Sequence, residues 1–119
     1  MSTLSKKIDF AILISVENAN PNGDPLCGNR PREDYDGYGE ISDVCLKRKI
    51  RNRLIDMNES VFVQSNDHRV DSYKSLKTRA EGCEELKKAS NGKDTDQDEF
   101  ARIACEQWMD VRSFGQVFA

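Results

Sequence analysis

The feature that most constrains the fold is an alternating run, KIDFAILISVE, at residues 7–17. Successive side chains of a β-strand point to opposite sides, so Ile8, Phe10, Ile12, Ile14 and Val16 would share one face. The opposite face is half apolar, because it carries Ala11 and Leu13 among polar residues. The run therefore predicts a strand inside a sheet, with neighbouring strands on both sides.

A long, proline-braced loop follows, from Asn18 to about Ser42. Pro21, Pro25 and Pro31 interrupt any helix or strand ladder, and the Asn-Pro and Asn-Gly pairs are turn signals. Connections of this length without regular structure are rare in compact domains and are usually functional or disordered. We therefore interpret residues 18–42 as a functional loop.

The next segment predicts a basic helix that starts at a capping Ser42 or Asp43 and ends near Asn58. Its apolar residues recur at helical spacing and would face the core: Leu46, Ile50, Leu54 and Met57. Between them, KRKIRNR at 47–53 holds five cations in seven positions and no acid. This run is either a phosphate-binding surface or an ordinary solvated face.

The net charge of −3 and the pI of about 5.2 argue against nucleic-acid binding when taken alone. The charge is uneven, however, and a phosphate responds to the local field around the basic run.

The second half of the chain is more polar. VFVQ at 61–64 is a candidate short strand, residues 58–99 form a polar insertion, and a helix is possible over 73–90. Thr95 and Asp98 have the spacing of a capping box. Beyond it, Phe100, Ile103, Ala104, Trp108 and Val111 predict a buried helical face, and DVRSFGQVFA at 110–119 suggests another strand.

Several classes of protein are disfavoured. No apolar stretch is long enough to span a bilayer and no secretory signal is evident, so we expect a soluble cytoplasmic protein. The four cysteines form no C-x-x-C and there is one histidine, which disfavours a zinc site and a disulfide framework. Asp34, Asp36 and Glu40 resemble part of a calcium loop, but the EF-hand spacing fails. We expect no metal and no cofactor.

The motifs in combination are more specific than any one of them. Four motifs together resemble the backbone subunit of the subtype I-C CRISPR effector complex, the Cas-seven family of Cascade. They are a strand ending in VENANPNGDP, then GNRPR, then SDVCLKRKIRN, which opens a helix, and later DVRSFGQVF. The resemblance implies an α+β fold with a ferredoxin-like, RNA-recognition-type core and insertions. The resemblance also implies a hairpin thumb in each subunit and a chain more than twice as long, and no thumb is evident here. We therefore expect residues 1–119 to form one incomplete, apparently truncated domain.

The resemblance also implies a function. Copies of the subunit would assemble head to tail in a helical filament along a CRISPR guide RNA, beside other Cascade subunits, with target DNA bound indirectly through the guide. Asn20, Asn22, Arg30 and Arg32 would contact phosphate, sugar or the next subunit. The electrostatic groove would come from Lys47, Arg48, Lys49 and Arg51. Arg112 and Gln116 are further candidates for RNA contact.

For this DNA-targeting subtype the resemblance implies a scaffold without catalysis. One alternative is a metal-dependent ribonuclease that uses Asp34 or Asp36, as related backbone subunits of RNA-targeting complexes do. A second alternative is a truncated form that makes only protein contacts.

Overall fold

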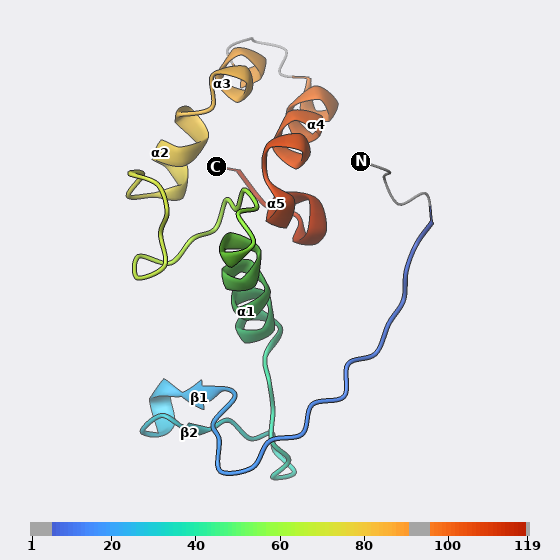
Figure 1. The fold of residues 1–119 in the computed structure, drawn as a ribbon, viewed down its shortest axis with the longest axis vertical. Coiled ribbons are helices and arrows are strands. Elements are labelled where there is room, and N and C mark those ends of the chain that lie inside the picture. Colours follow the sequence, from blue (N-terminus) through green and yellow to red (C-terminus); the bar gives the residue numbers. More distant parts are fainter. Residues whose placement is uncertain (1–5, 91–95, 119) are drawn as a thin grey trace. The chain divides into compact units, whose positions relative to one another are not determined.

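The computed structural model describes residues 6–90 and 96–118. The chain divides into two compact units, Met1–Ser42 and Asp43–Ala119, which we describe separately (Figure 1).

The first unit is built around a small hairpin. Strands β1 (Gly23–Asp24) and β2 (Arg30–Pro31) pair antiparallel, with Gly23 opposite Pro31, and a 3-10 turn, η1 (Pro25–Cys27), joins them. The side chain of Asp24 caps η1 by accepting from the N–H of Leu26. Gly28 ends η1 at a φ of 66°, a conformation that glycine adopts without a steric penalty.

The predicted strand at residues 7–17 is not formed within the described ranges. This segment runs as an extended trace (Figure 1). Its apolar side chains are exposed, and none of residues 8–16 makes a backbone hydrogen bond within the described ranges. A strand needs a neighbouring strand to pair with its N–H and C=O groups, and the described residues supply none.

The second unit is helical. It contains α1 (Asp43–Asp56), α2 (Leu76–Glu81), α3 (Glu84–Ser90), α4 (Gln97–Gln107) and α5 (Met109–Phe114). Its core joins Phe62, Leu86, Ile103, Ala104, Trp108 and Val111. The ring centroids of Phe62 and Trp108 are 4.5 Å apart, and Phe118 lies 5.0 Å from Phe62. The predicted buried face of 100–111 is therefore confirmed, with Phe100 packed at its margin.

Several predicted boundaries were wrong. The one helix considered possible over 73–90, with Gly82 as its weak point, is two helices, because the chain breaks at Gly82 and Cys83 between α2 and α3. A Cβ at Gly82 would collide with the side chain of Tyr73. Residues 109–114 form α5 and not a strand, because Trp108 adopts an extended conformation that ends α4 and redirects the chain.

The cap of α4 also differs from the prediction. Thr95 lies outside the described residues, and Asp96 is the N-cap, accepting from the N–H groups of Asp98 and Glu99.

Residues 61–63 are not a strand, yet their backbone polar groups are satisfied by charged side chains. Asp110 accepts from the N–H groups of Phe62 and Val63 at 2.7 and 3.0 Å, and Arg79 donates to the Phe62 carbonyl at 2.8 Å. Asp110 is fully buried and Arg79 is 5% exposed. These side chains replace the ladder that a neighbouring strand would have provided.

The described residues thus form a mostly helical structure with one two-stranded hairpin. The ferredoxin-like core stays a prediction. No helix within 6–90 or 96–118 is both long and apolar enough to cross a membrane.

Candidate nucleic-acid interface

The basic helix α1 turns an unexpected side inward. Ile55 is its buried apolar residue at 7% exposed, whereas Met57 is 58% exposed and Leu46 is 36% exposed. The predicted core stripe was therefore wrong at both ends. Arg48 and Arg51 share the inward side with Ile55, because the three residues lie three and four positions apart.

The inward arginines bind protein groups. Arg51 Nε donates to Asp110 Oδ2 at 2.9 Å, and its side chain is only 12% exposed. Arg48 Nη1 donates to the carbonyl of Val63 at 2.9 Å. Partial burial lowers the pKa of Arg48, and the nearby charge of Arg51 acts in the same direction. Arg48 therefore holds α1 against the 61–63 segment, and Arg51 holds it against Asp110 of α5.

The remaining cations of α1 are more accessible. Lys47 pairs with Asp43 at 3.0 Å and lies 5.8 Å from the centre of the Phe114 ring. Lys49 and Arg53 are exposed, and neither has an ion-pair partner in the described parts of the chain. They are four residues apart, so they lie on the same side of the helix. This side is a cationic surface that can accept phosphate groups.

In the first unit, two asparagines fix the shape of the loop. Asn22 Oδ1 accepts from both the N–H and the hydroxyl of Ser42 at 2.9 and 3.0 Å, which ties the start of the loop to its end. Asn20 Nδ2 donates to the carbonyl of Asn29 at 2.8 Å. Both amides are thus engaged in structuring the loop that was predicted to contact RNA.

The loop arginines differ in availability. Arg32 Nε pairs with Glu40 Oε2 at 2.6 Å, and this hydrogen bond raises the pKa of Arg32. Arg30, in β2, is exposed, and no side-chain partner is described for it among residues 6–90 and 96–118. Arg30 is therefore the more available cation of this loop.

The aspartates considered for catalysis lie in a second turn. Asp34 Oδ1 accepts from the N–H groups of Asp36 and Tyr38, each at 2.9 Å, so this carboxylate stabilises the turn itself. Tyr35 and Tyr38 are both exposed on this turn. The described residues contain no group of three or more histidine, cysteine or acidic side chains that could hold a metal ion.

The last two candidates lie near the end of the chain. Arg112 is exposed on α5, and its Nη2 contacts the sulfur of Met109 at 2.8 Å. Gln116 Nε2 donates to the carbonyl of Val117 at 2.8 Å. Neither residue is brought into contact with the arginines of α1 by a described hydrogen bond or ion pair.

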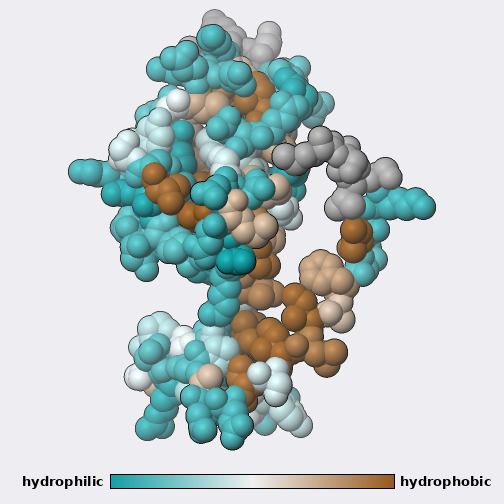
Figure 2. All heavy atoms as spheres, in the orientation of Figure 1, coloured by the Kyte–Doolittle hydropathy of each residue, from teal (hydrophilic) through white to brown (hydrophobic). Residues whose placement is uncertain are grey.

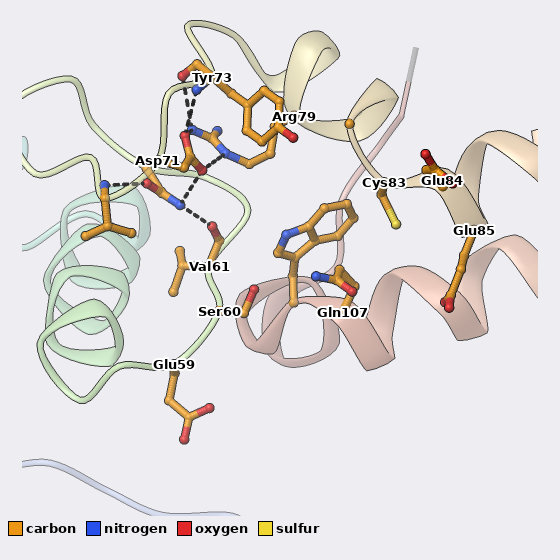
Figure 3. A pocket seen from close by; sticks show the side chains of 14 residues that line it. Glu59, Ser60, Val61, Asp71, Tyr73, Arg79, Cys83, Glu84, Glu85 and Gln107 are labelled. Atoms are coloured by element: carbon orange, nitrogen blue, oxygen red, sulfur yellow. Dashed lines mark hydrogen bonds and ion pairs between the residues drawn. The ribbon is translucent and has the colours of Figure 1, made fainter.

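A cavity of about 510 Å³ lies elsewhere in the helical unit, and Figure 3 shows its lining. Glu59, Asp71, Glu84 and Glu85 contribute carboxylates to it, whereas Arg79 is its one cation. Arg79 is already bound in a bidentate pair, with Nε to Asp71 Oδ2 at 2.7 Å and Nη2 to Oδ1 at 2.9 Å. The excess of carboxylates makes this cavity unsuitable for a phosphate.

The Asp71–Arg79 pair predicts a pH dependence of stability. The hydrogen bond from Arg79 holds the pKa of Asp71 below its usual value of 3.8. The folded state therefore favours the carboxylate, so this contribution is present above pH 3.8 and is lost as the pH falls below it.

Urea unfolding of the wild type and of Asp71→Asn should accordingly show a difference in unfolding free energy that is largest near pH 7. The difference should shrink as the pH falls through 3.8. The other carboxylates change the unfolding free energy with pH equally in both proteins, so their effect cancels in the difference. A difference that stays constant from pH 7 to pH 3 would contradict the role of this pair.

Sequence reasoning missed three residues. Arg53 belongs to the KRKIRNR run but was not selected as a contact, although its spacing from Lys49 places both on one side of α1. Asp110 and Arg79 are buried ionic groups, and no local pattern in the sequence distinguishes them from surface charges.

Residues 6–119 match the family described as "CRISPR-associated protein Cas7". Over 70 residues the chain is 39% identical to a curated relative, the CRISPR-associated protein Cas7 of Haloferax volcanii. That match covers 58% of this chain and 20% of the relative, so the chain corresponds to about a fifth of the relative's length.

Proposed function

The chain belongs to the Cas7 family of CRISPR-associated proteins, and we propose that it binds guide RNA as part of the backbone of a Cascade-type complex. Its partners in this proposal are the guide RNA, further copies of itself in a helical filament and other Cascade subunits. Target DNA is bound indirectly, through the guide. The subtype I-C assignment belongs to the proposal and rests on the sequence motifs.

The observation that carries the proposal is the exposed cationic side of α1. A chain with a net charge of −3 presents Lys49 and Arg53 together, four residues apart, with no described carboxylate paired to either. On a regular helix such a pair has a fixed spacing and suits successive contacts along a phosphate backbone. We assign the main phosphate contacts to this pair.

The role of the other candidates follows from their contacts. Arg48 and Arg51 position α1 on the helical unit, and Asn20 and Asn22 shape the loop. Arg30 is the loop cation that we expect to touch RNA directly. The proposed subunit acts as a scaffold, and the ferredoxin-like core remains part of this proposal.

The test is a fluorescence-anisotropy titration of a labelled single-stranded RNA with the full chain at several salt concentrations. The double variant Lys49→Gln and Arg53→Gln should reduce the slope of log affinity against log salt by about 1.4, since each phosphate contact on single-stranded nucleic acid contributes about 0.7. The affinity at low salt should fall about tenfold or more.

The matched control is Lys87→Gln with Lys88→Gln, which removes the same charge from two exposed positions on α3. Equal effects of the two double variants would refute a specific role for Lys49 and Arg53. No RNA binding by a folded wild-type chain would refute the proposed function and favour a protein-contact role.

A further inference from the structure

The helical unit presents mostly hydrophilic side chains on the face shown in Figure 2, so charge alone does not mark where RNA would bind. The basic run of α1 differs from the other charges by a regular alternation. An inner pair, Lys47 and Arg51, lies toward α5. An outer pair, Lys49 and Arg53, follows each of these by two residues and lies on the other side of the helix. Because α1 is one rigid helix, whatever holds the inner pair also orients the outer pair.

Phe114, at the end of α5, is a residue that both inner cations contact. The Nζ atom of Lys47 lies 5.8 Å and the Cζ atom of Arg51 lies 5.2 Å from the centre of its ring. Both distances are within the range of a cation–π interaction. Arg51 also binds Asp110, one turn earlier in α5. Asp110 and Phe114 are four residues apart, so two side chains from one side of α5 contact the same side of α1.

The helix that carries this ring is itself anchored. Asp110, in the first turn of α5, is fully buried and accepts from the N–H groups of Phe62 and Val63 at 2.7 and 3.0 Å. The ring of Phe114 is partly buried at the other end of the same helix. Lys47, by contrast, has a long side chain that is 38% exposed. An anchored ring therefore restrains a side chain that would otherwise sample many rotamers.

We propose that Phe114 is a positioning residue for RNA binding, because its ring holds the inner pair and so orients the outer pair toward the phosphate backbone. This role rests on the RNA binding proposed above for Lys49 and Arg53. Phe114 itself contributes no phosphate contact. Its contacts reduce the conformational freedom that α1 would lose on binding, which raises the affinity for RNA without adding a contact.

Fluorescence anisotropy with a labelled single-stranded RNA and the full chain tests this role. Phe114→Leu keeps an apolar side chain but removes the ring, so the affinity for RNA should fall about fivefold. The slope of log affinity against log salt should stay unchanged, because the number of phosphate contacts is the same. Phe114→Tyr keeps the ring and should bind RNA within about twofold of the wild type.

The matched control is Phe100→Leu, the same substitution at a ring on α4 whose centroid lies 5.1 Å from that of Phe118. No cation is described over the Phe100 ring within residues 6–90 and 96–118, so this variant should leave the RNA affinity unchanged. Hydrogen exchange of the free chain gives a second readout. Relative to the amides of α4, those of α1 should exchange faster than in the wild type in Phe114→Leu only.

The positioning role is overturned if Phe114→Leu binds RNA as tightly as the wild type, if Phe100→Leu weakens binding equally, or if Phe114→Tyr fails to restore it. A fall in the salt slope of about 0.7 would also overturn it, because the variant would then have lost a phosphate contact. If only variants of Lys49 and Arg53 weaken binding, the proposed function stands and the role of Phe114 falls. A folded wild type without RNA affinity refutes both.

Discussion

An Asp110→Asn variant is expected to lose about 3 kcal/mol of unfolding free energy, within the range for breaking a buried ion pair. Asp110 is fully buried and accepts three hydrogen bonds, from Arg51 and from the N–H groups of Phe62 and Val63. Asparagine has nearly the same shape but only one acceptor oxygen. The amide NH₂ group of asparagine would face one of the N–H donors that Asp110 now accepts from, and the charge of Arg51 would lose its partner.

Urea titration followed by the fluorescence of Trp108 measures this loss directly, because Trp108 is the one tryptophan of the sequence and is 4% exposed. Asp98→Asn is the control, since Asp98 also lies in the first turn of a helix but is exposed. A loss below about 1 kcal/mol in Asp110→Asn would show that the three hydrogen bonds are replaced by other partners.

Arg79→Met should be destabilised by a similar amount, about 3–4 kcal/mol. Methionine fills much of the same space but donates nothing, so the buried carbonyl of Phe62 and the carboxylate of Asp71 both lose a charged donor. Arg79→Lys keeps the charge and should recover part of the loss, because a single ammonium cannot reproduce the bidentate geometry.

Arg102 gives the contrast for this second experiment. It pairs with Glu99 and Glu106 on the surface of α4, at 2.8 and 2.7 Å, with its side chain 54% exposed. Solvent screens such pairs, so Arg102→Met should leave the unfolding midpoint almost unchanged. If Arg79→Met and Arg102→Met gave equal shifts, burial of the Arg79 pair would not be its source of stability.

The sequence predicted the helical elements that depend on local pattern. The start of α1 at Asp43 and the buried face through Ile103, Ala104 and Trp108 follow from capping chemistry and helical spacing, both of which act within a few residues. The break at Trp108 was missed, because residues on both sides of it have the same spacing of apolar positions.

The site was predicted less well, for a physical reason. A run of cations has no property that reveals which of its members meets a carboxylate 59 residues away, as Arg51 meets Asp110. The strand predicted at 7–17 is not formed within the described residues for a related reason, since alternation describes what a segment can pair with and does not supply the partner. In both cases, residues distant in the sequence decide whether the predicted contact or strand forms.

The use of side chains to hold residues 61–63 also has a consequence for the order of folding. The partners of this segment, Arg79 and Asp110, lie 17 and 48 residues further along the chain from Phe62. Closing contacts of such separation costs chain entropy before any stabilisation is gained, so α1 forms early as a local helix and docks late. During synthesis on the ribosome, Arg51 would therefore stay in water until Asp110 of α5 has emerged, whereas Val63, the partner of Arg48, emerges earlier.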